Sequence, residues 1–212
     1  MKLNTPPPLA YKKKHTHWDD TLSFGKAFLK QPFSTGAIAP SSKYLAQRIV
    51  ADLDLDRAKH VVEVGPGTGA ITQAILGRLK ESSQYLGIDL NPIFIQRLRL
   101  RFPDACFHLG SAEHLRSELN ARQIETVDFV ISSLPWTLFS PQRQHTILTE
   151  IVQSLSTQGE FTTFAYVHSL FLPSWRRFRR VLNEHFNSVS QSRIIWANLP
   201  PAVIYHCKNS LD

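Results

Sequence analysis

A glycine-rich stretch between residues 61 and 72 constrains this chain more than any other feature. It begins with an apolar run that ends in an acid, and it continues with three glycines at alternate positions, Gly65, Gly67 and Gly69. A helix-like spacing of apolar residues follows, so the pattern predicts a buried parallel strand, a tight turn and a crossover helix. Glycine permits positive φ and lets a ligand approach the main chain without meeting a Cβ. We therefore expect a ligand-binding turn at the carboxyl end of a strand.

The spacing of the glycines indicates which ligand this is. It is Gly-x-Gly-x-Gly with Glu63 two residues ahead, whereas dinucleotide-binding turns have Gly-x-Gly-x-x-Gly. A second apolar run ends in Asp89, about twenty residues further on, where an acid can accept hydrogen bonds from ribose hydroxyls. The turn resembles motif I of the class I S-adenosylmethionine methyltransferases, which implies S-adenosylmethionine as cofactor and S-adenosylhomocysteine as product. The alternative is a turn that only packs the first strand on its helix.

The third expected strand ends near Ser111, where the resembled family holds an acidic or polar residue that binds the adenine amino group. Glu113 could serve there instead, or it could be an exposed residue of the first helical turn. The cofactor contacts that the resemblance implies are Glu63, Gly65, Gly67, Thr68, Gly69, Asp89, Leu90, Ser111, Ala112 and Ser132.

Length and composition set the limits of these interpretations. The chain has 212 residues, 42% hydrophobic and 19% charged, which is typical of one globular domain with a full core. No apolar run is long enough to span a bilayer and the first residues lack the apolar core of a signal peptide, so we expect a cytoplasmic protein. Cys106 and Cys207 have no metal-type spacing and are expected to be reduced and half-buried in strands. The net charge of +7 favours an anionic partner, either a nucleic acid or an acidic membrane surface.

The chain alternates between strand and helix patterns, which predicts an α/β fold with helices on both faces of a sheet. A terminal hairpin is expected over residues 186–196 and 202–208. This arrangement agrees with the Rossmann-like class I methyltransferase fold, a seven-stranded, mostly parallel sheet whose last strand is antiparallel. The other expected strands cover residues 60–64, 84–88, 105–108, 127–131 and 159–166, and the expected helices cover residues 69–80, 92–101, 113–120 and 141–155.

We expect three parts along the chain: a basic flexible leader over residues 1–16, an N-terminal helical segment over 17–56, and an S-adenosylmethionine-binding domain over 57–212. Residues 18–30 have the pattern of an amphipathic helix. Two interpretations remain open for it, a helix packed over the cofactor site or one that lies in a membrane interface. The expected membrane contacts are Trp18, Leu22, Lys26, Phe28, Arg176 and Arg177, the last two in a second amphipathic stretch over residues 174–182.

The fourth expected strand leads into the sequence Ser-Ser-Leu-Pro-Trp, residues 132–136. This loop resembles the Asn-Leu-Pro-Tyr acceptor motif of adenine-N6 methyltransferases, including the ribosomal RNA adenine dimethyltransferases. Here Ser133 replaces the Asn and Trp136 replaces the Tyr. The replacement removes the donor and acceptor pair that would hold an adenine amino group, which weighs against RNA as the acceptor.

A closer resemblance, over nearly the whole chain from Phe24 onward, is to the bacterial phospholipid N-methyltransferases. It implies phosphatidylethanolamine as acceptor, methylated up to three times to phosphatidylcholine, by an enzyme peripherally associated with the cytoplasmic membrane. The segments that carry it besides the glycine turn are Phe24–Leu29, Gly36–Ser42, Ser133–Pro135, Phe164–Tyr166 and Asn198–Ala202.

Methyl transfer to an amine requires alignment of a neutral amine with the methyl group, and a methylated ammonium suits aromatic faces. We therefore expect Trp136, Phe139 and Tyr166 around the acceptor, although each could be an ordinary core aromatic. Ser133, Trp136 and Tyr166 are the catalytic candidates, and the substrate-binding candidates are Leu134, Pro135, Phe139 and His168. His168 could equally be a surface or packing residue, and no residues have metal-ligand spacing.

Three functions therefore compete. A lipid-headgroup N-methyltransferase agrees with the basic and aromatic segments. An RNA adenine-N6 methyltransferase could use the same segments to bind phosphates and stack bases, but no C-terminal helical domain of the kind such enzymes usually carry is expected after the hairpin. A binding protein that has kept the cofactor fold and lost activity is the third, and the intact Glu63 and Asp89 weigh against it.

Overall fold

The computed structural model describes residues 43–209, and its central feature is a sheet of seven strands in the order β3-β2-β1-β4-β5-β7-β6. β1 to β5 are parallel, and β7 is antiparallel to both β5 and β6. The strands are β1 His60–Val64, β2 Gln84–Asp89, β3 Cys106–Leu109, β4 Val127–Ser132, β5 Leu155–Tyr166, β6 Ser188–Gln191 and β7 Ala202–Lys208. The expected Rossmann-like methyltransferase sheet with an antiparallel last strand is confirmed.

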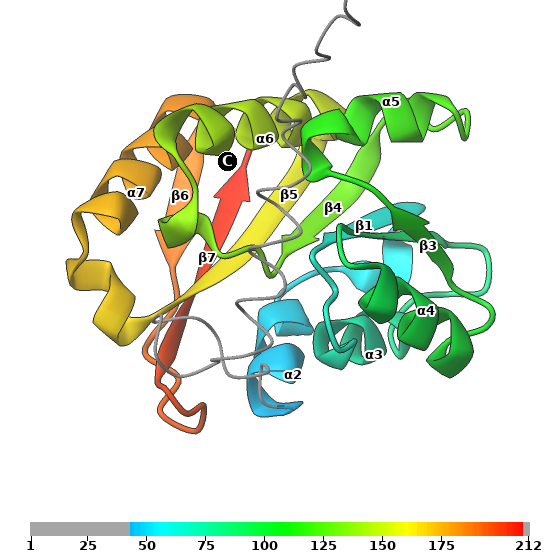
Figure 1. Ribbon diagram of the computed structural model, residues 1–212, viewed down its shortest axis with the longest axis horizontal. Helices are drawn as coiled ribbons and strands as arrows, with labels where there is room; N and C mark the ends of the chain where they lie inside the picture. The colour runs from blue at the N-terminus through cyan, green and yellow to red at the C-terminus, as the bar shows by residue number, and fades with distance from the viewer. Residues whose placement is uncertain (1–42, 210–212) are drawn as a thin grey trace, which may run out of the picture.

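Helices cover both faces of the sheet. In Figure 1 α5, α6 and α7 lie above the sheet and α2, α3 and α4 lie below it. The α-helices are α2 Lys43–Ala51, α3 Ala70–Leu76, α4 Pro92–Arg101, α5 Leu115–Asn120, α6 Pro141–Ser154 and α7 Pro173–His185. Within residues 43–209 four short 3₁₀ turns join these elements: η1 Leu55–Arg57, η2 Ala112–His114, η3 Trp136–Leu138 and η4 Val167–Phe171.

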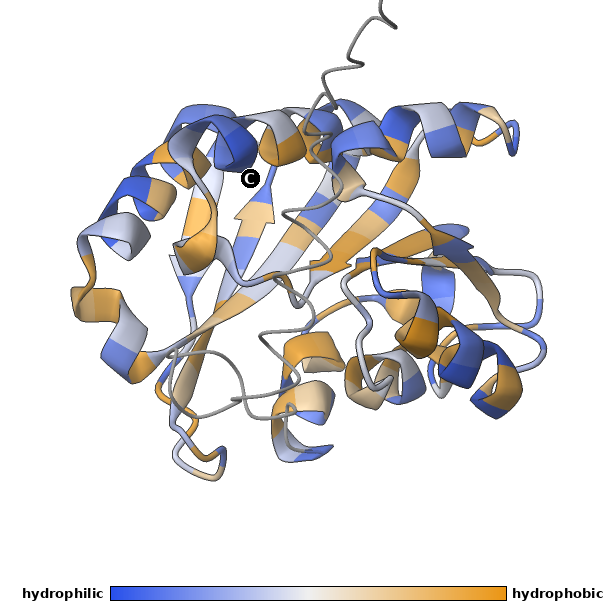
Figure 2. Cartoon of the chain, viewed as in Figure 1, coloured by the Kyte–Doolittle hydropathy of each residue, from blue (hydrophilic) through white to orange (hydrophobic). Residues whose placement is uncertain are grey.

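Two hydrophobic cores result from the alternation of side chains along the strands. Val62 of β1 packs with α5, α6 and α7, whereas its neighbour Val61 packs with α2, α3 and α4. Because β1 and β4 lie at the centre of the sheet, both of their faces are buried, which explains their nearly continuous apolar sequences. Figure 2 shows the hydropathy of each residue along these helices and strands, with apolar and polar residues alternating along the helices.

Several element boundaries differ from the expectations. β5 begins at Leu155 rather than near residue 159, because Leu155 pairs with Val127 before a register shift. The strand expected over residues 186–196 shortens to β6, after which Ser192 bonds Ile204 irregularly. The helix expected over 113–120 begins as the 3₁₀ turn η2, and α3 ends at Leu76.

Some expectations fall outside the described residues, namely the basic leader, the amphipathic helix over residues 18–30 and Gly36–Ser42. Both cysteines lie in strands with free thiols, but Cys106 is exposed and Cys207 is buried, so the expectation that both are half-buried was wrong. None of the helices in residues 43–209 has the length and apolarity needed to cross a membrane.

Candidate active site

The glycine turn links β1 to α3 in the expected way. Gly65, Gly67 and Gly69 have φ angles of 79°, 54° and 82°, which is the left-handed region that favours glycine. A Cβ on Gly67 would meet nothing closer than the Gly65 carbonyl oxygen, 3.9 Å away, so the main chain there is open to a ligand. A Cβ on Gly69 would instead meet Leu98 at 2.7 Å, because α4 packs directly against the turn.

Glu63 lies beneath the turn and is fully buried. One of its carboxyl oxygens, Oε2, accepts hydrogen bonds from the Thr72 hydroxyl at 2.7 Å and from the Tyr85 hydroxyl at 2.5 Å. The other oxygen, Oε1, has no hydrogen-bond partner among the described residues. Burial raises the pKa of Glu63 to about 7, and the bonds from Tyr85 and Thr72 only partly oppose this rise. Glu63 therefore ties α3 and β2 to β1 directly under the turn.

Asp89 ends β2 beside the turn. Its Oδ2 accepts a hydrogen bond from the Gly67 N–H at 3.0 Å, and its Oδ1 accepts one from the Asn91 N–H at 2.8 Å. Burial raises the pKa of this carboxyl, while the backbone bonds lower it. Each carboxylate oxygen can accept a further bond, as ribose hydroxyls require. Leu90 follows half-buried.

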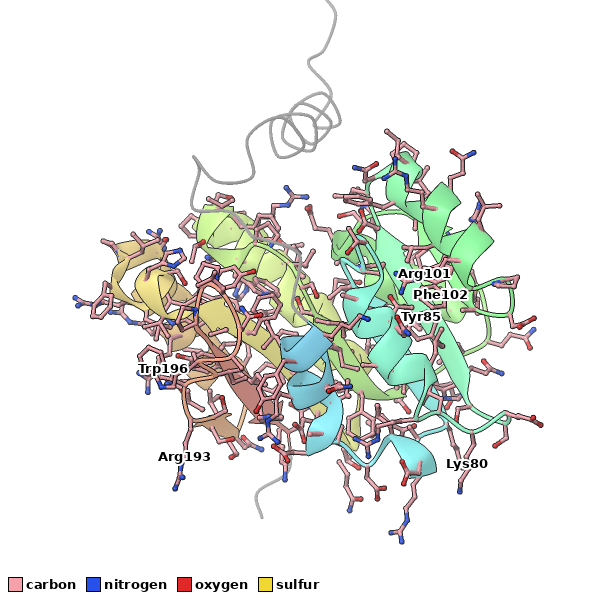
Figure 3. All side chains as sticks on the ribbon, turned by 90° about the horizontal axis from the view of Figure 1, so that it is seen from below. Lys80, Tyr85, Arg101, Phe102, Arg193 and Trp196 are labelled. Atoms are coloured by element: carbon pink, nitrogen blue, oxygen red, sulfur yellow. The ribbon has the colours of Figure 1, made fainter. Side chains whose placement is uncertain are left out.

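Arg101 of α4 holds the outer side of the turn. Its guanidinium donates hydrogen bonds to the Thr68 carbonyl at 3.1 Å and to the Gln73 side chain at 2.5 Å. It also lies over the ring of Phe102, 4.8 Å from the ring centre, and Figure 3 shows both side chains near Tyr85. Thr68 itself is exposed. These contacts fix the backbone of a turn whose glycines would otherwise be free to move.

The segment after β3 uses its polar groups locally. The Ser111 hydroxyl oxygen accepts a hydrogen bond from the Glu113 N–H at 3.2 Å and so caps the turn η2. The Glu113 carboxylate pairs with Arg143 at 2.6 Å. Ala112 is buried in the core. Glu113 is therefore a paired residue rather than an exposed one, and the Ser111 hydroxyl serves the backbone.

The loop after β4 is pinned to the glycine turn. Ser132 is fully buried, and its hydroxyl oxygen accepts hydrogen bonds from the Leu134 N–H and the Trp136 indole N–H, each at 3.2 Å. The Ser133 N–H donates to the carbonyl of Val64, the last residue of β1, at 3.0 Å. The Leu134 side chain lies so close to the turn that a Cβ on Gly65 would meet it at 2.9 Å. Two segments far apart in sequence thus form one continuous surface.

Trp136 is a core side chain, only 2% exposed. Its ring stacks on Phe178 of α7 with 4.4 Å between ring centres, and its indole N–H also donates to the Thr163 hydroxyl at 3.2 Å. The remaining side of the ring meets Phe139 and Phe161 edge to face. The Trp136 ring therefore packs in the core, in agreement with the alternative that it is an ordinary core aromatic.

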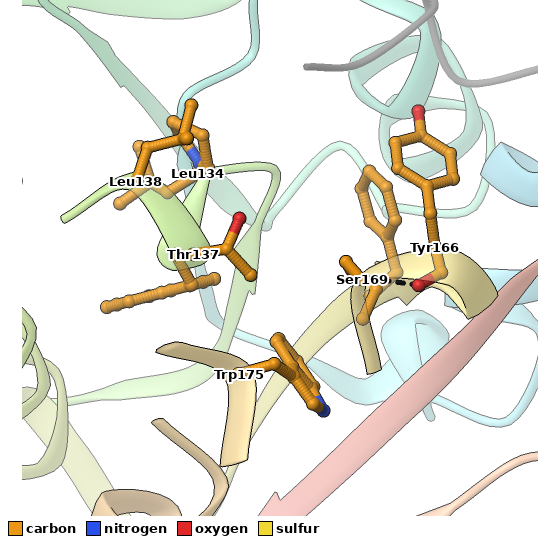
Figure 4. Close-up of a pocket in the computed structure, with 10 residues that line it drawn as sticks. Leu134, Thr137, Leu138, Tyr166, Ser169 and Trp175 are labelled. Atoms are coloured by element: carbon orange, nitrogen blue, oxygen red, sulfur yellow. Dashed lines mark hydrogen bonds between the residues drawn. The ribbon is translucent and has the colours of Figure 1, made fainter. Parts of the chain in front are cut away.

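A small cavity of about 30 Å³ lies between this loop and the end of β5. Figure 4 shows the loop residues on one side, Tyr166 and Ser169 on the other, and Trp175 between them. The lining residues are Leu134, Pro135, Trp136, Thr137, Leu138, Phe164, Ala165, Tyr166, Ser169 and Trp175. The structure thus brings four of the expected acceptor-side residues to one cavity.

Tyr166 is the ionisable side chain among the described residues that line the cavity. It is 5% exposed, and burial raises its pKa to about 12, so the phenol stays protonated at neutral pH. Its ring stacks on the exposed His168 at 5.7 Å between centres and meets Phe164 edge to face. His168 is outside the cavity lining, as is Phe139, whose ring lies under the Arg143 guanidinium.

Sequence reasoning missed several residues of the site. Thr72 and Tyr85 hold Glu63, and Thr137, Ser169 and Trp175 line the cavity. Thr72 lies on the buried side of α3, where a polar residue needs a partner, so its position could have indicated the bond. The described residues contain no group of three or more potential metal ligands.

The residues present fit S-adenosylmethionine. The open main chain at Gly67 and the carboxylate of Asp89 meet at the carboxyl ends of β1 and β2, where this fold binds nucleoside ligands. A family model described as a methyltransferase domain matches residues 61–159. Among solved structures, the N-methyltransferase NodS from Bradyrhizobium japonicum WM9, in complex with S-adenosylhomocysteine, has a TM-score of 0.61 at 13% identity, covering 88% of this chain and 98% of that one.

The fold and the glycine-turn site define a class I S-adenosylmethionine-dependent methyltransferase. The ornithine lipid N-methyltransferase of Singulisphaera acidiphila is 32% identical over 193 residues, which cover 90% of this chain and 96% of that protein. The chain therefore belongs to this methyltransferase class and, within it, resembles the lipid N-methyltransferases. The ribosomal RNA small subunit methyltransferase A of Synechococcus sp. (strain CC9605) is 33% identical over 98 residues, 45% of this chain and 34% of that protein.

Proposed function

We propose that this protein transfers methyl groups to the amine headgroup of a membrane lipid, namely phosphatidylethanolamine and its mono- and dimethylated forms, leading toward phosphatidylcholine. The observation that carries the proposal is the similarity to a lipid N-methyltransferase along 90% of the chain. This similarity extends beyond the matched methyltransferase domain, residues 61–159, to the segments that form the acceptor side. Because that relative is named for ornithine lipid, an ornithine lipid is the second acceptor to test.

S-adenosylmethionine supplies an electrophilic methyl group when it is bound. Asp89 and the Gly67 main chain are the residues that we assign to holding it, with Glu63 fixing the turn from below. Ser133 and Leu134 follow β4 and border the turn, which supports their assignment to the region between the two ligands. The remaining cofactor contacts named from the sequence stay proposals.

The acceptor amine would enter the cavity beside Tyr166. Pro135 and Leu134 form one wall, and Tyr166 forms the other. The aromatic ring and hydroxyl suit an amine that becomes a methylated ammonium. We assign Trp136 a positioning role, because its buried ring holds the acceptor loop through Ser132. His168 and Phe139, at the margin of this region, are assigned to headgroup contacts.

A phenol with a pKa of about 12 is a poor proton acceptor at neutral pH. The cavity lining in the described part of the chain holds no carboxylate that would stabilise an ammonium ion. We therefore expect the enzyme to bind the neutral form of the headgroup amine and align it, rather than deprotonate an ammonium ion. Alignment alone can account for a large rate increase in an in-line displacement.

The enzyme would act while peripherally associated with the cytoplasmic membrane. Arg176 and Arg177 are exposed on α7 and available to anionic lipid. Each basic residue near such a surface contributes about 1 kcal/mol of attraction to the membrane. Trp18, Leu22, Lys26 and Phe28, outside the described residues, are proposed as further membrane contacts.

The test is transfer of radiolabelled methyl from S-adenosylmethionine to three acceptors offered in parallel. These are anionic vesicles containing phosphatidylethanolamine, the same vesicles containing an ornithine lipid, and ribosomal RNA. Label in methylated phosphatidylethanolamine would support the proposal, and label only in ornithine lipid would keep the lipid class but change the acceptor. Label only in RNA would refute the proposal, as would label in none of the three.

A further inference from the structure

Exposed apolar side chains cluster at the end of β5 that carries the cavity. Phe171 and Leu172, at the end of η4, are 72% and 44% exposed. Trp196 and Leu199, in the loop between β6 and β7, are 73% and 84% exposed. We call these four residues the apolar rim. Exposed single apolar residues are common on protein surfaces, so the rim requires an argument from its position and its charge.

The position of the rim follows from the sheet. Tyr166, the last residue of β5, pairs with Ala202, the first residue of β7, so the loop before β7 lies beyond the end of β5. The turn η4 begins at the next residue, Val167, whose N–H donates to the carbonyl of Pro201 at 2.8 Å. The two segments that carry the rim therefore meet at the end of β5 that carries Tyr166. In Figure 2 the ribbon of η4 has both hydrophobic and hydrophilic stretches, and in Figure 3 Trp196 lies at the edge of the molecule.

The surroundings of the rim are positively charged. Glu184 is the only acidic residue between positions 161 and 209, a stretch that contains five arginines and one lysine. Arg176 and Arg177 are exposed one turn after Leu172, and Arg193 is exposed in the same loop as Trp196 and points outward in Figure 3. Exposed aromatic and aliphatic tips flanked by arginines are suited to an anionic lipid interface, where the tips enter the acyl boundary and the arginines meet the headgroups.

We infer that the apolar rim inserts into the surface of an anionic phospholipid bilayer. Because the rim adjoins the cavity, insertion brings the headgroup layer to the acceptor site, so a lipid amine can enter without leaving the membrane. This inference rests on the proposed function for its choice of partner. It adds a second membrane contact that is independent of the N-terminal segment and lies at the mouth of the site.

Fluorescence of Trp196 tests the insertion directly. The chain has four tryptophans, and Trp136 and Trp175 are buried at 2% and 3% exposure. In a Trp18→Phe background, Trp196 therefore remains as the exposed tryptophan. We expect its emission to shift to shorter wavelength and to be quenched by lipids brominated on the acyl chain, in vesicles of phosphatidylethanolamine and phosphatidylglycerol. Absence of quenching in vesicles that bind the protein would overturn the inference.

Substitution of the rim gives the second readout. The double variant Phe171→Ser, Trp196→Ser should bind these vesicles with an affinity reduced by roughly tenfold or more, because it loses two large apolar contacts. Leu100→Ser is the matched control, since Leu100 is 79% exposed on α4 and outside the rim. Unchanged binding by the double variant, or an equal loss in the control, would overturn the inference.

A short-chain phosphatidylethanolamine that stays dissolved as a monomer separates the rim from the proposed function. The double variant should methylate this soluble acceptor at the wild-type rate and lose activity only on vesicles. Equal loss on both acceptors would contradict the rim as a membrane contact. If the wild-type protein methylates neither acceptor while Trp196 is still quenched, the proposed function fails and the inserted rim stands.

Discussion

Substitution of Glu63 by Gln should change how the stability of this protein depends on pH. In the folded protein burial raises the pKa of Glu63 from 4.5 to about 7. Below pH 4.5 the carboxyl is protonated in both states. Between pH 4.5 and 7 the unfolded chain releases this proton while the folded chain retains it, so unfolding becomes easier as pH rises. Gln has no proton that titrates in this range, so the free energy of unfolding of the Glu63→Gln variant should lack this pH-dependent loss.

The size of the effect follows from the pKa rise. At 1.36 kcal/mol for each pH unit, the wild-type protein should lose roughly 3 kcal/mol relative to Glu63→Gln between pH 4.5 and 7, and no more above pH 7. Gln can still accept the bonds from Tyr85 and Thr72 through its amide oxygen. Its amide nitrogen takes the place of Oε1, which has no partner among the described residues. Burying this amide nitrogen costs the variant the same free energy at every pH, so it does not change how the free energy of unfolding depends on pH.

The assay is urea unfolding followed by tryptophan fluorescence at pH 5, 6, 7 and 8, with both proteins in the same buffers. The histidines are common to both proteins, so their titration cancels in the difference. Tyr85→Phe is a control that should enlarge the effect which Glu63→Gln removes. Loss of the hydroxyl that donates to Glu63 should raise the pKa of Glu63 further, so the free energy of unfolding should continue to fall to a higher pH than in the wild type. Parallel curves for the wild type and Glu63→Gln across this range would refute the reasoning.

Four further substitutions test the site. Asp89→Ala should abolish S-adenosylmethionine binding in calorimetry, and near-native affinity would contradict its assignment. Gly67→Ala should weaken that binding by roughly tenfold or more, because its Cβ enters the open space left for the ligand, and its left-handed φ should lower the free energy of unfolding by about 1–2 kcal/mol. Gly69→Ala should cost roughly 2–4 kcal/mol in urea unfolding through left-handed strain and contact with α4, whereas Gly77→Ala, at φ −68°, should be close to neutral. Tyr166→Phe should slow methyl transfer about three- to tenfold and leave the pH profile unchanged between pH 6 and 9, since its pKa is about 12; an altered profile would show that the phenol acts as a base.

The fold could be predicted because its evidence is local. Strand and helix periods, and glycines at alternate positions, depend on neighbours in sequence, so the seven-stranded sheet and the turn were predicted correctly. The start of β5 was not, because residues 156–159 are polar and contain a glycine, which is typical of a loop. In the structure this stretch lies within β5 at a register shift against β4, and only the partner strand determines this.

The site was less predictable, since it depends on contacts between distant segments. The sequence places Trp136 in the acceptor loop but gives no sign that Phe178, on α7, covers its ring. It identifies Glu63 but not Tyr85, which reaches it from the neighbouring strand. Ser111 occupies the position of an adenine contact, yet its hydroxyl oxygen accepts a bond from the backbone of η2. The partners of Trp136 and Glu63 come from distant segments that the local sequence does not reveal, whereas the partner of Ser111 lies two residues further along its own segment.

The contact between Leu134 and the glycine turn explains how the two halves of the site can act together. Ser133 bonds the end of β1, and Leu134 fills the space above Gly65, so a displacement of the turn should also displace the loop after β4, to which we assign the acceptor. In an in-line displacement the rate depends on the distance and angle between the two reacting atoms. A site that relies on alignment therefore needs a rigid link between its cofactor side and its acceptor side more than it needs a base. The absence of any carboxylate in the described cavity lining, together with a tyrosine that remains protonated, agrees with this requirement. The pH dependence of transfer should consequently follow the ionisation of the acceptor amine itself.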